Sequence, residues 1–122
     1  MATARPRGVP TTAELAEAVR EFLQTELLPT AEGRAQFMTR VAINVVAMIE
    51  RELALGPACA EAHAAALRRL GCSTDAELAR AIRDGSLDAR IDEVIAVTRQ
   101  STIAKLRIAN PRYLREEDQE WT

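Results

Sequence analysis

Two arginines and an asparagine share one narrow stripe of a long, otherwise apolar helix candidate between Arg34 and Leu55. On a 3.6-residue period, Arg40, Asn44 and Arg51 lie on the same side of this helix. Two guanidinium groups flanking an amide would suit a carboxylate or a phosphate, because a guanidinium donates two parallel hydrogen bonds to either group. The two arginines are about 16 Å apart along the helix, however, so they cannot hold one small anion together. The alternative is that both arginines pair with glutamates of an adjoining helix, and that Asn44 joins two helices or satisfies a loop carbonyl.

A carboxylate and a lysine interrupt the apolar stripes of the two longest helix candidates. Glu52 falls among apolar residues of the first helix, and Lys105 continues the apolar stripe of the second. The ammonium group of Lys105 either extends to water at the end of the bundle or pairs with Glu52 or Glu50. The second possibility predicts a polar pocket between the two helices for a ligand that carries a phosphate or a carboxylate. The candidate ligand-binding residues are Arg40, Asn44, Glu52, Lys105, Asn110 and Arg112.

The standard signatures of catalysis and cofactor binding are missing from the sequence. It has no glycine-rich phosphate loop, no Gly-x-Ser-x-Gly, no His-Glu-x-x-His and no paired Glu-x-x-His. The one histidine, His63, lies among alanines, and we do not expect it to act as a catalytic base. Cys59 and Cys72 form no Cys-x-x-Cys pair; we expect two reduced thiols, with a disulfide as the alternative. We therefore expect no catalytic residue, no metal and no cofactor.

Charge and hydropathy argue against nucleic acids and membranes as partners. The chain has 16 Lys and Arg against 18 Asp and Glu, a net charge of −2, so it has no basic excess to attract phosphate backbones. A turn at Gly71 resembles that of a helix-turn-helix, but the helix after it begins with Asp75, where a DNA-reading helix needs phosphate-binding groups. The purest apolar run, 41–49, is interrupted by Asn44, and no apolar core of signal-peptide length follows Met1. We expect a cytoplasmic protein that binds neither nucleic acid nor membrane.

The residue pattern predicts an all-α fold. Aromatic residues make up 3% of the chain, and no stretch alternates apolar and polar residues as a half-buried strand does. Thr11 with Glu14, and Thr74 with Glu77, have the spacing of a helix-starting capping box, and Gly56 followed by Pro57 is expected to end a helix. Five helices are predicted, over about 11–28, 31–55, 58–70, 75–84 and 87–109.

Helices of these lengths, joined by short loops, favour an antiparallel bundle in which 31–55 and 87–109 form the main contact. We expect one helical domain over 11–114, preceded by a disordered arm at 1–10 and followed by a charged tail at 115–122. Two apolar residues outside the main stripes, Val97 and Ile103, would not be covered in such a bundle, which suggests association with a second copy or another protein.

Two stretches resemble the signature of a bacterial family of small helical proteins of unknown function. They are Phe37-Met-Thr-Arg-Val-Ala-Ile-Asn-Val-Val-Ala-Met-Ile-Glu-Arg-Glu-Leu-Ala-Leu-Gly56 and Ala104-Lys-Leu-Arg-Ile-Ala-Asn-Pro-Arg-Tyr-Leu114. Members of that family are often encoded beside acyl-CoA dehydrogenase-like and aminoglycoside-phosphotransferase-like proteins. The resemblance implies an accessory protein of such an enzyme, with no catalytic residues to transfer. The polar positions that match the family pattern are Arg40, Asn44, Glu50, Arg51, Glu52, Lys105, Asn110 and Arg112.

We expect a noncatalytic accessory or interaction protein, associated with an acyl-CoA or small-molecule kinase pathway and either homo-oligomeric or bound to an enzyme. The alternative is a small-molecule binding protein or enzyme that uses the polar pocket between the two long helices.

Overall fold

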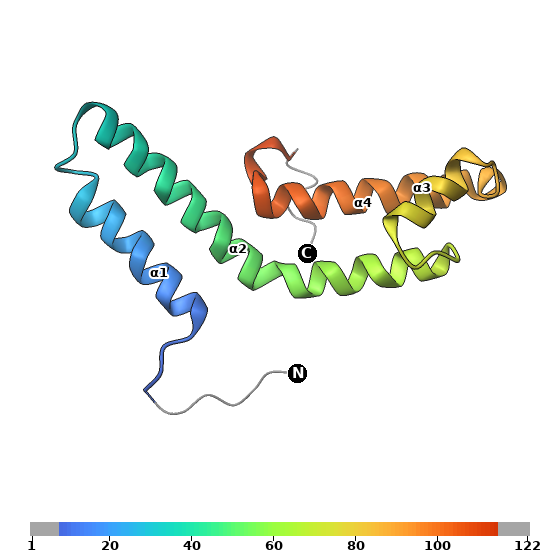
Figure 1. The fold of residues 1–122 in the computed structure, drawn as a ribbon, viewed down its shortest axis with the longest axis horizontal. Helices are drawn as coiled ribbons and strands as arrows, with labels where there is room; N and C mark the ends of the chain where they lie inside the picture. Colours follow the sequence, from blue (N-terminus) through green and yellow to red (C-terminus); the bar gives the residue numbers. More distant parts are fainter. Residues whose placement is uncertain (1–7, 115–122) are drawn as a thin grey trace. The chain divides into compact units, whose positions relative to one another are not determined.

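The computed structural model describes residues 8–114, and every regular element in that range is a helix, as the sequence predicts (Figure 1). The predicted tail at 115–122 and most of the predicted arm at 1–10 lie outside the described residues. Four α-helices are present in the described range instead of five. The elements are α1 Thr12–Phe22, the π-helix η1 Leu23–Leu27, α2 Gly33–Arg69, α3 Asp75–Arg83, the 3-10 helix η2 Asp88–Arg90, α4 Ile91–Ala109 and the 3-10 helix η3 Pro111–Tyr113.

The chain divides into two compact units within α2. Unit 1 is Met1–Ala54 and unit 2 is Leu55–Thr122, and each is described by itself. The single helical domain expected over 11–114, and the antiparallel bundle, stay predictions.

The expected break between two helices at Gly56 and Pro57 is wrong. Residues 33–69 form one continuous α-helix with Pro57 inside it. Gly56 does not adopt the left-handed conformation that ends a helix, since the glycines with positive φ among the described residues are Gly8, Gly33, Gly71 and Gly85. The φ of proline is itself compatible with a helix; what proline lacks is the N–H that would bond the carbonyl four residues earlier. The flanking residues keep the helix continuous at the cost of that one hydrogen bond.

Replacing Pro57 by alanine is therefore expected to stabilise the protein. Pro57 is exposed, so alanine removes no core contact, and it restores a backbone donor to the carbonyl of Leu53. The gain in the free energy of unfolding should be about 1–2 kcal/mol, because the ~3 kcal/mol helix penalty of proline is partly offset by its stiffening of the unfolded chain. Urea unfolding followed by circular dichroism measures the change in the free energy of unfolding. The control is Ala58→Gly, which should destabilise the protein by ~1 kcal/mol. A variant less stable than wild type would mean that the fold depends on the proline.

Unit 1 is a helical hairpin in which α1 lies beside the N-terminal half of α2 (Figure 1). The predicted capping box starts α1: the Thr11 hydroxyl accepts from the backbone N–H of Glu14, whose carboxylate accepts from the backbone N–H of Thr11. The α1 turns continue through η1, a wider helix. Two residues of the hairpin, both on α2, are buried: Thr39, whose hydroxyl donates to the Ala35 carbonyl at 2.6 Å, and Ile43.

Unit 2 holds the main hydrophobic core of the described residues. Its members come from the C-terminal end of α2, from α3, from α4 and from the turns that join these helices, and are Ala66, Leu67, Leu70, Cys72, Leu78, Leu87, Val94 and Val97. The corners around this core follow the sequence signals: Gly71 has a φ of 77°, and the Thr74 hydroxyl accepts from the Glu77 N–H at the start of α3. At the start of α4, Arg90 donates to the Arg69 carbonyl at 2.8 Å and joins that helix to the end of α2.

The core also corrects one expectation. Val97 and Ile103 were expected to stay uncovered, but both are buried, at 8 and 9% exposure. They therefore provide no reason for association with another chain.

Candidate functional site

The three predicted site residues of unit 1 are exposed on α2. Arg40, Asn44 and Glu52 all lie on its surface, and Arg51 is partly buried. Glu50 was one of the two expected partners of Lys105, but its carboxylate bonds Arg20 of α1. The predicted pairing of Lys105 with Glu52 stays a prediction, because the two residues belong to separate units.

The Arg20–Glu50 ion pair was missed by the sequence analysis. The Nε and Nη2 atoms of Arg20 donate to the two carboxylate oxygens of Glu50 at 2.5 and 3.3 Å, and both side chains are about three-quarters buried, at 26 and 23% exposure. The hydrogen bond to Glu50 raises the pKa of Arg20. The pair lies on the side of α2 that carries Thr39 and Ile43, so it orients α1 on that side. No spacing rule could have found it, since thirty residues separate the partners.

The three predicted site residues of unit 2 lie near the end of α4. Lys105 and Arg112 are exposed, and Asn110 is partly buried, with its backbone N–H donating to the Leu106 carbonyl at 2.7 Å to close the helix. The chain then turns through η3 to Leu114, which is 7% exposed.

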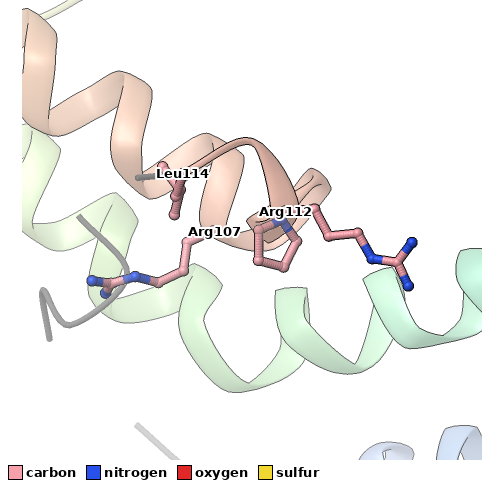
Figure 2. Close-up of a pocket in the computed structure, with 4 residues that line it drawn as sticks. Arg107, Arg112 and Leu114 are labelled. Atoms are coloured by element: carbon pink, nitrogen blue, oxygen red, sulfur yellow. The ribbon is translucent and has the colours of Figure 1, made fainter. Parts of the chain in front are cut away.

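This turn borders a small, open pocket of about 260 Å³ lined by Arg107, Pro111, Arg112 and Leu114 (Figure 2). Of the predicted site residues, Arg112 contributes to it directly. The sequence analysis missed Arg107, whose Nε and Nη2 atoms are buried and make no hydrogen bond to any described residue. Arg107 lies in the last turn of α4, where a basic side chain commonly interacts with the unpaired backbone carbonyls of the helix end. The sequence therefore gave no reason to single it out.

Two further contacts between polar side chains lie in unit 2. The Nε2 atom of His63 is 2.6 Å from the Asp75 carboxylate. Cys59 lies one helical turn before His63, but within residues 8–114 no hydrogen bond joins its thiol to the imidazole, so the contact has no activated nucleophile. Both thiols are free. At the start of α4, Arg90 donates from Nε and Nη2 to Glu93 at 3.2 and 2.7 Å; this bonding lowers the pKa of Glu93.

Within the described range, no group of three or more His, Cys, Asp or Glu side chains is arranged to hold a metal ion. Across those same residues, no helix has both the length and the apolar character needed to cross a membrane. What the described residues offer chemically is one buried, unpaired guanidinium edge and a set of exposed apolar side chains on α2.

Comparison with known proteins identifies a family for most of the chain. The family model described as a domain of unknown function (DUF6285) matches residues 29–113, a range that begins after η1 and ends with η3. No curated protein and no solved structure matches the chain. The match covers well over half of the 122 residues, and it agrees with the resemblance at the level of a family of unknown function. The chain therefore belongs to the DUF6285 family.

Proposed function

We propose that the protein is a noncatalytic interaction protein that pairs with a second copy of itself through the exposed side of α2 in unit 1. The observation that carries this proposal is the order of residues on that side. Six residues with alternating spacings of four and three, all of them exposed, form what we call the outer stripe: Arg34, Met38, Val41, Val45, Met48 and Glu52.

The outer stripe lies opposite the side of α2 that faces α1. Thr39, Ile43 and Glu50 share one side of the helix, where two of them are buried and the third bonds α1. The outer stripe is centred about 180° away on a 3.6-residue period. An apolar residue every 3.5 positions on average is the pattern with which one helix packs along another, so this side of α2 suits a second helix.

The outer stripe is symmetric about Ile43. Val41 and Val45 are each two positions from it, Met38 and Met48 five positions, and Arg34 and Glu52 nine positions. Two copies that meet antiparallel around a twofold axis would therefore place valine on valine, methionine on methionine and arginine on glutamate. A contact between identical subunits requires this self-complementarity, because the same surface has to serve both partners.

The exposed area agrees with an interface of low to moderate affinity. Val45 is 49% exposed and Met38 45%, and beside the stripe Phe37 is 65% and Ile49 47% exposed. With Val41 and Met48, these side chains expose on the order of 500 Å² per copy, or roughly 1,000 Å² for the pair, near the lower limit for a specific interface. We therefore expect dissociation in the micromolar range.

Exchanging the charges at the two ends of the outer stripe tests the proposal. Arg34→Glu and Glu52→Arg should each weaken pairing several-fold, because two exposed ion pairs of about 0.2–1 kcal/mol each become like-charge contacts. The double variant should regain the wild-type affinity, since glutamate then faces arginine again. Sedimentation equilibrium of the full chain measures the dissociation constants, and Arg40→Glu, with the same charge change elsewhere on α2, should leave pairing unchanged.

Two results would overturn the proposal. One is a wild-type protein with the mass of one chain up to high micromolar concentration. The other is a double variant no better than the single ones, which would remove the antiparallel register.

The accessory role in an acyl-CoA or small-molecule kinase pathway is part of this proposal and rests on the family resemblance. Mixing the protein with an acyl-CoA dehydrogenase-like or phosphotransferase-like enzyme encoded beside it should produce a complex whose mass includes both chains. Two separate masses for every such enzyme would remove the pathway association and leave self-pairing intact. A small-molecule binding role is kept as the second candidate, since Arg112 lines a small pocket at the turn after α4.

A further inference from the structure

The first helical segment of unit 1 carries an exposed apolar stripe of its own. Its members, which we call the α1 stripe, are Leu15, Val19, Phe22 and Leu27, with exposed fractions of 54, 50, 55 and 40%. The side of α1 that lies toward α2 is different: Ala16, Arg20 and Leu23 are partly buried there, and Arg20 bonds Glu50. On a 3.6-residue period, the α1 stripe is centred about 100° from that side, so α2 does not cover it.

The π-helix η1 extends the α1 stripe to Leu27. In an α-helix, Glu26 would follow Phe22 on the same side, because it comes four residues later. In η1 the backbone N–H of Leu28 donates to the carbonyl of Leu23, five residues earlier, at 2.8 Å, so this turn contains one more residue than an α-helical turn. Leu27, five residues after Phe22, therefore continues the stripe. Single π-turns of this kind are rare and are found frequently at functional sites.

The α1 stripe has the dimensions of a surface that receives one helix. Leu15 and Leu27 are about 18 Å apart along the axis at ~1.5 Å per residue, which is the length of about three helical turns. The four side chains expose on the order of 400 Å², the size of apolar patch that often marks an interaction site on a soluble protein. A helix that lies along the stripe would cover all four side chains.

The charges around the α1 stripe are acidic. Between Thr12 and Leu27 the only basic residue is Arg20, which bonds Glu50. The same range has four exposed acids, which are Glu14, Glu17, Glu21 and Glu26. A second copy would bring the same acids to this surface, and an anionic membrane would bring phosphates, so this surface repels both. It attracts a partner with positive charge.

We propose that the α1 stripe binds an amphipathic helix of a partner protein whose apolar side is flanked by lysine or arginine. The apolar residues of that helix would cover the α1 stripe, and its cations would lie among the exposed glutamates. This surface is separate from the outer stripe, which lies on the side of α2 away from α1, so a self-paired protein can bind one such helix on each copy. It also lies outside the matched family domain, because α1 and η1 precede residues 29–113.

The test uses a designed peptide of about 18 residues, long enough to form a helix. It has leucine at positions spaced i, i+3, i+4 and i+7, and lysine elsewhere. Isothermal titration calorimetry of the full chain at low ionic strength should give a dissociation constant on the order of 100 μM, because the covered area is below that of a standard interface. A peptide with the same leucines and glutamate in place of lysine should bind at least tenfold more weakly.

Two exposed phenylalanines of unit 1 provide a matched pair of variants. Phe22→Ala should weaken binding of the lysine peptide at least tenfold, because aromatic residues at the centre of an interface contribute most of its binding energy. Phe37→Ala makes the same change on α2, at a side chain that is 65% exposed, and should leave the affinity for the peptide within about twofold of wild type. Leu27→Ala should also weaken binding, since η1 places Leu27 in the stripe. Circular dichroism checks that the helix content of each variant is unchanged.

Four results would overturn the proposal. The first is a wild-type affinity in Phe22→Ala or Leu27→Ala, and the second is equal binding of the lysine and glutamate peptides. The third is a second copy on the stripe, which would appear as pairing that survives Val45→Glu and is lost in Phe22→Ala. The fourth is binding to phosphatidylglycerol vesicles that requires Phe22, which would assign the stripe to a membrane surface.

The same variants separate this proposal from self-pairing. A chain with Val45→Glu should bind the lysine peptide as tightly as wild type, and a chain with Phe22→Ala should still pair with a second copy. Failure of one proposal therefore leaves the other intact.

Discussion

Replacing Val45 by glutamate is expected to separate the paired protein into single chains. Val45 lies two positions from the centre of the outer stripe, so in an antiparallel pair it faces Val41 of the partner's stripe, and each copy contributes the same contact. The substitution would place two carboxylates in an apolar contact, where an unpaired charge costs several kcal/mol. A substitution at a strong interface position costs about 2 kcal/mol of binding free energy, and here it occurs once in each copy. The dissociation constant should therefore rise roughly a thousandfold.

The substitution should leave the hairpin itself folded. Val45 is 49% exposed and lies on the side of α2 away from Ile43, so glutamate at this position points to water in the single chain. Light scattering after size exclusion, at a series of concentrations, gives the mass, and far-ultraviolet circular dichroism checks the helix content.

Arg40→Gln is the matched control for Val45→Glu. It makes the net charge more negative by one, as Val45→Glu does, at an exposed position of α2 outside the outer stripe. The control should keep the wild-type mass. If Val45→Glu also keeps the wild-type mass at every concentration, the outer stripe is not the interface, and α1 or unit 2 would have to provide it.

Replacing Leu67 by alanine is expected to cause the largest loss of stability. Leu67 is 4% exposed and belongs to the core of unit 2 with Leu70, Leu78 and Val94. The loss of a buried leucine side chain combines lost hydrophobic transfer with the cost of a cavity, together about 2–5 kcal/mol. For a protein of this size, the melting temperature should fall by about 10–20 °C.

The matched control for Leu67→Ala is Ile95→Ala in α4, which also removes three carbon atoms but from a side chain that is 58% exposed. Its cost should stay below about 1 kcal/mol. Differential scanning calorimetry compares the two variants with the wild type. Similar losses in both variants would mean that the core of unit 2 does not lie where the structure has it.

The same calorimetric traces test the predicted single domain over 11–114. One cooperative domain responds to Leu67→Ala with one transition at a lower temperature. If units 1 and 2 unfold independently, one transition moves and another stays at its wild-type temperature.

Local sequence signals predicted the starts and ends of several helices correctly. The helices α1 and α3 begin at the predicted pairs, Thr11 with Glu14 and Thr74 with Glu77. In each pair the threonine hydroxyl accepts a hydrogen bond from the otherwise unpaired backbone N–H three residues later, and this bond does not depend on the rest of the fold. Gly71 has the positive φ expected after a helix. These signals act over one helical turn, so the residues that carry them are adjacent in the sequence.

The same local reasoning failed at Gly56 and Pro57. A glycine followed by a proline is typical of a helix end, yet α2 continues through both residues. The φ of proline fits a helix and only one hydrogen bond is lost, so the helix can continue where the turns on both sides hold it, which a local rule does not include.

The sequence by itself determined that the protein is helical, where most helices begin, and which residues share a stripe of α2, because helical periodicity follows from chain geometry alone. Only the tertiary structure decided which side of α2 faces α1, that Val97 and Ile103 are buried, and that Glu50 pairs with Arg20. It also decided that the Nε and Nη2 atoms of Arg107 are buried without a hydrogen-bond partner among the described residues. Each of these depends on residues far apart in the chain or on how a turn folds back. Burial and pairing are properties of the surroundings of a side chain, which no spacing along the sequence encodes.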